Sequence, residues 1–361
     1  MDHRKYVPVL KWKMGEYQAL SRLEDNIKAR VVPLIEIPPP GYDFESQQLK
    51  KTNEEHLKDF GKRLSSKWGN RSCFVDLLHF DKAVRVAKQH CITHIFEQTV
   101  EHGCNAIPVL NAGSTESCLK AAAKIPSIEK VGLAIRLSGD DFDDPRLGTK
   151  LTHISNTVGV SWGEVDVVVD LGTPDYSPKT VFRGGLNERL KAIPQSAKAR
   201  SVIIVGSSFP ESLQAYKDEN FIPRREFTGY TDFVNFLDDS ARVPTFGDYS
   251  ATHPSIVELD MRLIKPYAKL RYTLTDKWYI AIGKAVRTAG FEQYRDMCQA
   301  LIDEDFFDGG DFSAGDKYIE DCANGDVPTG NLSTWVWVAT NRHITKTVVD
   351  LASFHGFSNK L

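Results

Sequence analysis

The sequence predicts a (β/α)8 barrel, an α/β fold of the TIM type, with an insertion between strand eight and the final helix. Eight apolar runs, each closed by a polar residue, are the main observation. Helix-like segments separate them. Runs rich in β-branched residues in this arrangement are typical of buried parallel strands, and eight such units close into a barrel. The runs are Tyr6–Lys11, Val31–Glu36, Cys73–Asp76, Ala106–Asn111, Val131–Arg136, Val165–Asp170, Val202–Ser207 and Val243–Asp248.

The segments between the runs have apolar residues three or four positions apart, as amphipathic helices do. Pro178 would occupy the first position of one helix, and Gly103 would follow the end of another. Each helix leads into the next apolar run, as a right-handed βαβ repeat requires. The predicted helices are 16–29, 81–102, 115–125, 177–193 and 226–237.

The repeat ends after Asp248. The alternating, aromatic-rich segments 267–273 and 277–282 predict a β-hairpin, and 291–302 predicts a helix. The last helix, 333–354, would pack as the eighth helix of the barrel. We therefore expect one barrel domain over 1–361, with 249–330 inserted as a lid made of the hairpin and short helices.

Composition narrows the class of protein. The 361 residues are 41% hydrophobic, and 45 basic against 48 acidic residues give a net charge of −3. This balance does not indicate nucleic-acid binding by bulk charge. Six cysteines without a CxxC pair, no apolar leader and no membrane-length apolar run predict a reduced, cytoplasmic protein without a membrane partner. The sequence has no glycine-rich strand–helix turn, so no nicotinamide or flavin cofactor is expected.

Alternation within the strands tests the barrel model. If Glu36 points inward, so does Leu34, and by the same rule Asp248 would share the inner face with Phe246. Asp166 would lie near the barrel floor, where a buried carboxylate needs a partner. The resulting inner sets are apolar below and polar at the mouth.

The polar ends supply a mixed-charge rim. It comprises Lys11, Lys13, Glu36, Asp76, Asn111, Arg136, Asp170, Ser207, Asp248 and Arg271. Carboxylates suit Mg²⁺ or Mn²⁺, and lysine and arginine suit an anionic group on a substrate. We expect Glu36, Asp76, Asp170 and Asp248 to hold the metal. Lys11, Lys13, Asn111, Arg136, Ser207 and Arg271 would bind substrate, with Glu36, Asp248 and His253 catalytic.

Simpler interpretations stay open. A single Asp at a strand end is often a helix cap, and opposite charges in a barrel mouth often form structural ion pairs. Two of the carboxylates would alternatively serve as the acid and base of a glycosidase.

Several stretches resemble the beta protein family of phages, prophages and related mobile elements. They are Tyr6–Glu16, Pro33–Pro38, Phe246–Ser250 with His253-Pro254, Leu270–Thr273 with Lys277-Trp278, and Asn341–His343. The resemblance spans essentially the whole chain and adds Glu16 and Tyr249, the latter as a substrate-binding residue, to the candidate site. It implies a role in conflict between phages and hosts or between phages.

Two functional hypotheses follow. The first is a divalent-metal-dependent hydrolase of a phosphate-containing small molecule or nucleic acid. The second is a non-catalytic binding protein that contacts a protein partner in phage defence or superinfection exclusion.

Overall fold

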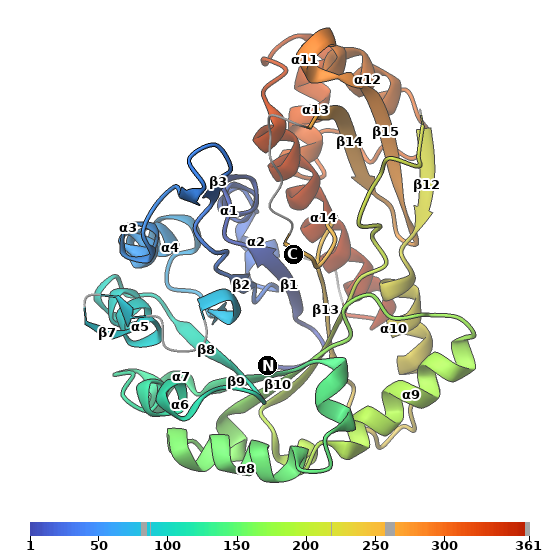
Figure 1. Cartoon of the computed structure of the whole chain (residues 1–361). Coiled ribbons are helices and arrows are strands. Elements are labelled where there is room, and N and C mark those ends of the chain that lie inside the picture. Colours follow the sequence, from blue (N-terminus) through green and yellow to red (C-terminus); the bar gives the residue numbers. More distant parts are fainter. Residues whose placement is uncertain (81–84, 87, 218, 257–263, 358–361) are drawn as a thin grey trace. The chain divides into compact units, whose positions relative to one another are not determined.

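Eight parallel strands form a closed barrel, which confirms the predicted fold class (Figure 1). The computed structural model describes residues 1–80, 85–86, 88–217, 219–256 and 264–357. Around the barrel, the strands follow the order β1, β13, β11, β10, β9, β8, β5, β2. Their bounds are β1 Tyr6–Lys11, β2 Leu34–Glu36, β5 Cys73–Asp76, β8 Ala106–Asn111, β9 Leu133–Leu137, β10 Val165–Asp170, β11 Ser201–Gly206 and β13 Thr245–Asp248.

Contacts divide the chain into two compact units. The first, the barrel unit, contains 1–12, 32–206 and 229–248, and so includes all eight barrel strands. The second unit contains 13–31, 207–228 and 249–361. It is therefore wider than the predicted insertion at 249–330.

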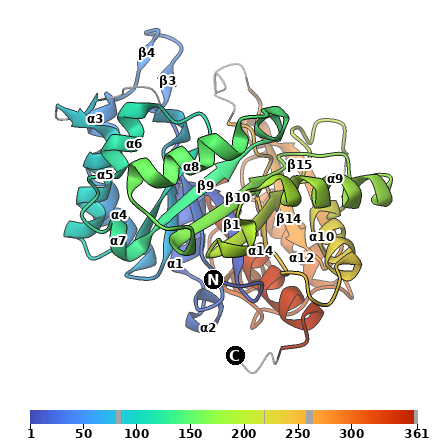
Figure 2. The same ribbon diagram turned by 90° about the horizontal axis from the view of Figure 1, so that it is seen from below.

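Helices surround the barrel strands, and Figure 2 shows α8 and α9 across the outside of β9 and β10. The helices of this unit are α3 Asn53–Leu57, α4 Phe60–Trp68, α5 Cys91–Glu101, α6 Glu116–Ala122, α7 Ile128–Val131, α8 Leu147–Val158 and α9 Lys179–Ala192. The unit boundary falls within α10 Arg225–Phe236, whose residues from Gly229 onward belong to the barrel unit. Two small antiparallel pairs, β3 Tyr42–Asp43 with β4 Gln48–Leu49 and β6 Arg85–Val86 with β7 Gln89–His90, project from the connections.

The second unit is built around a three-stranded sheet in the order β12, β15, β14. The longest helix of the unit, α14 Leu332–Phe354, is capped by Asn331, whose side chain accepts hydrogen bonds from the backbone N–H groups of Ser333 and Thr334. The elements are α1 Met14–Ser21, α2 Asp25–Lys28, β12 Glu219–Pro223, β14 Tyr267–Thr273, β15 Lys277–Ala285, α11 Val286–Ala289, α12 Gln293–Ile302, α13 Ala314–Asn324 and α14 Leu332–Phe354.

Most element predictions are confirmed, with local corrections. The hairpin and helices α9, α10, α12 and α14 lie where the patterns place them. The helix predicted over 16–29 is interrupted between α1 and α2. The one predicted over 81–102 begins only at Cys91; residues 81–84 and 87 of that prediction lie outside the described residues. The final helix belongs to the second unit, where it packs against α1, α13 and β14.

Candidate active site

Arg136, at the carboxyl end of β9, is the centre of the barrel mouth. Its Nη1 lies 2.8 Å from Glu36 Oε1 and 2.6 Å from Asp76 Oδ2. Its Nε and Nη2 donate to Asp170 Oδ2 at 3.0 and 2.6 Å. The three carboxylates come from β2, β5 and β10, and contact with one guanidinium from β9 requires all four side chains to enter the barrel interior. The sequence prediction that Glu36, Asp76, Asp170 and Arg136 share one rim agrees with this geometry.

The three carboxylates have different environments. Asp76 Oδ1 accepts the backbone N–H of Leu78 at 2.8 Å, and Asp170 Oδ1 accepts that of Gly172 at 2.9 Å. These contacts fix the orientation of both carboxylates. Burial instead raises the pKa of Glu36; the Arg136 charge opposes this shift, and the Asp76 charge adds to it. Glu36 is therefore held closer to its protonated form than an exposed glutamate would be.

The mouth has an excess of negative charge. Three carboxylates against one guanidinium leave a formal excess of two negative charges. Lys11 is the register partner of Glu36 on the neighbouring strand β1 and shares its face, which offsets one charge. A proton on Glu36 would offset the other. The raised pKa of Glu36 and the excess of negative charge therefore both favour a protonated Glu36.

The oxygen donors have the chemistry that Mg²⁺ and Mn²⁺ prefer, but their arrangement does not form a coordination site. Within the described part of the chain, no group of three or more His, Cys, Asp or Glu side chains is placed to hold a metal ion. The carboxylate oxygens of the mouth contact Arg136 instead. Metal binding by Glu36, Asp76, Asp170 and Asp248 stays a prediction.

Asp248 lies on the opposite face of its strand from the one predicted. The register pairs Gly247 with Val7 and Val205, on the face that carries Glu36 and Arg136, whereas Asp248 pairs with Pro8 and Gly206. Asp248 accepts a hydrogen bond from the Tyr6 hydroxyl at 2.5 Å. The inner position is Gly247, which has no side chain, so the polar residue beside it was mistaken for the rim residue.

Phe246 shows the same correction. Its ring lies 5.9 Å from that of Tyr6 and 5.0 Å from that of Tyr230 on α10, between the strands and the surrounding helix. Phe246 and Asp248, which were predicted to share the inner face of strand eight, therefore lie on its outer face. Thr245 and Gly247 point inward.

The barrel floor confirms that Asp166 requires a partner. Its carboxylate accepts from Arg200 Nη2 and from the Ser201 hydroxyl, both at 2.6 Å. Arg200 Nη1 also donates to the carbonyl of Val131 at 2.8 Å. Asp166 lies one inward position before Val168 and two before Asp170, and is therefore remote from the mouth.

Other predicted site residues have local structural contacts. Asn111 is the register partner of Arg136, and its Oδ1 accepts the N–H of Gly113 at 3.1 Å, which orders the following turn. Ser207 Oγ accepts the N–H of Phe209 at 3.1 Å. Tyr249 is buried.

Six predicted residues belong to the second unit and not to the barrel unit: Lys13, Glu16, Ser207, Tyr249, His253 and Arg271. Lys13 is exposed and precedes α1, while Glu16 is buried within α1. His253 and Arg271 line a cavity formed by the second unit alone. The predicted site residues are thus divided between the two units. Of these residues, Glu36, Asp76 and Asp170 of the barrel unit contact Arg136.

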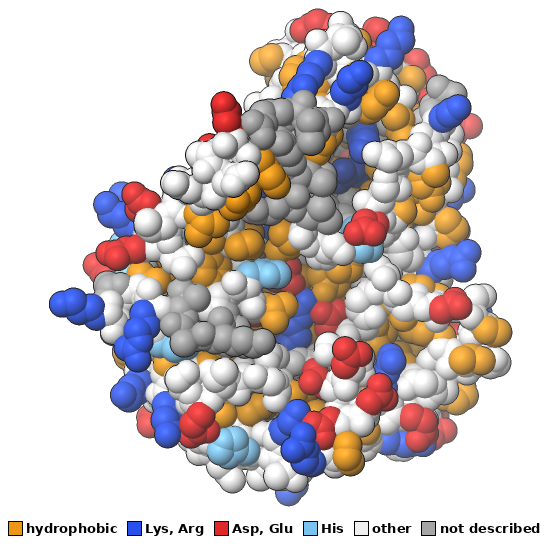
Figure 3. Space-filling view, in the orientation of Figure 1, with side chains coloured by type: hydrophobic (Ala, Val, Ile, Leu, Met, Phe, Trp, Pro, Cys, Tyr) orange, Lys and Arg blue, Asp and Glu red, His pale blue; other side chains and the backbone are white. Residues whose placement is uncertain are grey.

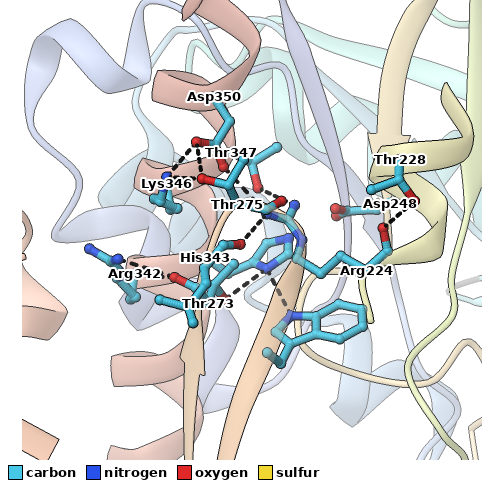
Figure 4. Close-up of polar contacts among 12 residues, drawn as sticks. Arg224, Thr228, Asp248, Thr273, Thr275, Arg342, His343, Lys346, Thr347 and Asp350 are labelled. Atoms are coloured by element: carbon cyan, nitrogen blue, oxygen red, sulfur yellow. Dashed lines mark hydrogen bonds and ion pairs between the residues drawn. The ribbon is translucent and has the colours of Figure 1, made fainter. Parts of the chain in front are cut away.

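A buried polar network in the second unit was not predicted (Figure 4). Arg224 Nη2 donates to the Thr347 hydroxyl at 2.9 Å, and Arg224 Nη1 donates to the Leu274 carbonyl at 2.9 Å. The His343 Nδ1 lies 3.1 Å from the Thr273 hydroxyl, and its ring stacks on Trp278. The Asn341–His343 motif was the available signal, and these contacts give it a packing role.

The fold and the mouth define a (β/α)8-barrel protein with a buried, arginine-centred carboxylate group at its strand ends. The family model described as "Beta protein" matches residues 6–349, and the chain belongs to this family. No curated protein matches the sequence significantly. Among the described residues, no helix has the length and apolar character needed to cross a bilayer.

Proposed function

We propose that the barrel mouth is the active site of a hydrolase that works by general acid–base catalysis. The supporting observation is that Glu36, Asp76 and Asp170 share Arg136 but differ in burial and in hydrogen-bond partners. Burial favours a proton on Glu36, whereas Asp76 and Asp170 each accept a backbone N–H. A buried carboxyl group that keeps its proton can act as a general acid, and a neighbouring carboxyl group in contact with water can act as the base.

The geometry suggests a role for each side chain. Glu36 would donate the proton to the leaving group. Asp170 would activate water, because its side chain is 13% exposed whereas those of Glu36 and Asp76 are 4% exposed. Arg136 would hold both carboxyl groups in position, with Asp76 fixing its guanidinium.

Metal-assisted hydrolysis of a phosphate-containing substrate is the second candidate. The surplus negative charge supports it, because a divalent cation would neutralise the mouth and attract an anionic substrate. It would require Asp76 and Asp170 to share their oxygens between the cation and Arg136.

The family setting supports a phage-associated role for either chemistry. The non-catalytic alternative, an interaction protein in phage defence or superinfection exclusion, draws support from a different observation. Arg136 makes contacts with three carboxylates, which is also the arrangement of a purely structural ion-pair cluster.

The test is hydrolysis of nitrophenyl glycosides and nitrophenyl phosphate mono- and diesters, with Mg²⁺, with Mn²⁺ and with EDTA. Wild type is compared with Glu36→Gln and Asp170→Asn; Glu188→Gln on the exposed face of α9 is the matched control. We expect each mouth variant to lose about 10²–10⁴-fold in rate, with the control unchanged.

Dependence on added metal, abolished by EDTA, would favour the second candidate over metal-free acid–base catalysis. Absence of hydrolysis in every arm, or wild-type rates in both mouth variants, would contradict the proposal and favour the interaction protein.

A further inference from the structure

The second unit contains a cavity of about 720 Å³ that is independent of the barrel mouth. A volume of this size accommodates a drug-sized organic molecule and is far larger than a single inorganic anion needs. Phe209–Gln214, Thr252, His253, Ile264–Tyr267, Lys269, Arg271, Tyr294, Leu332, Trp335 and Val336 line it.

Strand β14 directs its two faces to different environments. Tyr267, Lys269 and Arg271 alternate along the strand and line the cavity. Ala268, Leu270 and Tyr272 occupy the intervening positions and are buried in the apolar core of the unit. Core packing on one face therefore fixes the direction of both cations on the other.

The cavity wall is predominantly basic. Its described lining residues include Lys265, Lys269 and Arg271, with Glu211 as the carboxylate. Glu16 adds a negative charge near Arg271. The positive charge is not fully cancelled: burial, and after it the charge of Arg271, lower the pKa of Lys269. Figure 3 shows Lys and Arg side chains gathered on the face of this unit, over α11, β14 and β15.

Aromatic residues supply the apolar part of the wall. The rings of Tyr294 and Trp335 stack in parallel with centroids 4.2 Å apart, and the Tyr294 hydroxyl accepts the backbone N–H of Lys269 at 2.9 Å. Phe209 lies beside the Arg271 guanidinium, 5.5 Å from ring centroid to Cζ, while Arg271 Nη1 donates to the Ala251 carbonyl at 3.0 Å. Tyr267, with 49% of its surface exposed, lies on the same wall.

We propose that this cavity binds an organic phosphate of nucleotide size, with Lys269 and Arg271 contacting the phosphate groups and the aromatic wall contacting the organic body. Two cations held side by side on one strand match a group with several anionic oxygens, since each charge then gains a charge-assisted hydrogen bond. An anion between them would also relieve the repulsion between Lys269 and Arg271. The cavity volume and aromatic wall favour a nucleotide over inorganic phosphate.

The test is calorimetric titration of the full chain, without metal and at low salt, with ATP, inorganic pyrophosphate and adenosine. We expect ATP to bind most tightly, pyrophosphate more weakly and adenosine most weakly. Lys269→Gln should weaken ATP binding by about tenfold or more. Arg271→Lys, which keeps the charge but loses the planar donor pair, should weaken it less.

Lys284→Gln, at an exposed position of β15 outside the cavity lining, is the matched control and should bind as wild type does. Glu36→Gln should also retain binding, which separates this proposal from the one for the barrel mouth. Wild type that binds neither ATP nor pyrophosphate, or a Lys269→Gln variant with undiminished ATP affinity, would overturn the proposal.

Discussion

Glu36 and Asp166 are both buried barrel carboxyl groups, yet their partners differ. Asp166 receives two donors from Arg200 and a third from Ser201. Glu36 shares one guanidinium with two competing carboxylates. Hydrogen bonds from dedicated donors offset the free-energy cost of removing a carboxylate from water. When several carboxylates share one donor group, part of that cost is not offset. The same barrel therefore contains one carboxylate with its own donors and one whose charge is incompletely compensated.

The raised pKa of Glu36 predicts a pH effect on stability. The folded chain keeps this proton above the ordinary glutamate pKa of 4.5, where the unfolded chain has released it. The free energy of unfolding should therefore fall as pH rises through the window between 4.5 and the folded-state pKa. Denaturant titrations of wild type and Glu36→Gln at several pH values test this. Glu36→Gln should lack this part of the decline; identical slopes would contradict the prediction.

Removal of the floor carboxylate should destabilise the barrel. Asp166→Ala leaves Arg200 and Ser201 without their acceptor, and we expect a loss of about 3 kcal/mol in the free energy of unfolding, the lower end for a broken buried pair because Arg200 is partly exposed. Chemical denaturation measures this loss. Lys191→Ala, which breaks an exposed pair with Glu188, should change stability little. A comparably small effect of Asp166→Ala would show that the floor pair is not needed.

At the scale of the element, β13 closes the barrel through a glycine. A Cβ at Gly247 would lie 2.7 Å from the Val7 carbonyl oxygen and 2.8 Å from Val205 Cγ2. The neighbouring strands β1 and β11 therefore leave no room for a side chain at this inner position. That constraint also places Asp248 on the outer face.

Gly247→Ala should consequently destabilise the protein by about 1–3 kcal/mol through overpacking. The control is Gly184→Ala in α9, where an added Cβ meets nothing within 4 Å. That substitution should stabilise the helix by about 0.5–1 kcal/mol because alanine restricts the unfolded chain. Melting temperatures that move in opposite directions confirm the prediction, and a neutral Gly247→Ala would contradict it.

The sequence was sufficient to predict the repeating elements because each carries its own period. Apolar runs identified the eight barrel strands, and alternation gave the correct inner face for Glu36, Arg136 and Asp166. Alternation failed at β13, where the inner residue is a glycine. It also missed β12, a short and mostly exposed strand whose pairing with β15 depends on residues about sixty positions later in the chain.

The site was less predictable for a related reason. Position at a strand end does not specify which group a side chain meets, so the sequence did not reveal that Glu36, Asp76 and Asp170 all contact Arg136. His253 and Arg271 follow the last barrel strand along the chain, but their side chains line a cavity of the second unit. The division of the chain into two units, which the sequence does not reveal, is what separates these residues from those around Arg136.

At the scale of the whole molecule, the two units are interleaved along the chain. The chain alternates between them over 1–12, 13–31, 32–206, 207–228, 229–248 and 249–361. Each unit consists of three chain segments that are joined through the other unit. If one unit unfolds, the segments of the other are therefore connected by longer unfolded loops, which destabilises it. We expect a single unfolding transition in scanning calorimetry, with calorimetric and van't Hoff enthalpies that agree. Two separated transitions would contradict this coupling.

Closure of the barrel has a consequence for synthesis on the ribosome. Strand β1 emerges first, but its partner β13 is translated much later: Tyr6 and Asp248, which share a hydrogen bond, are 242 residues apart. At ordinary elongation rates that interval is on the order of tens of seconds. During it the nascent sheet has an open edge of apolar strand, the kind of surface that recruits other chains. Slow translation or a shortage of chaperones should therefore lower the soluble yield more than a small loss of equilibrium stability would.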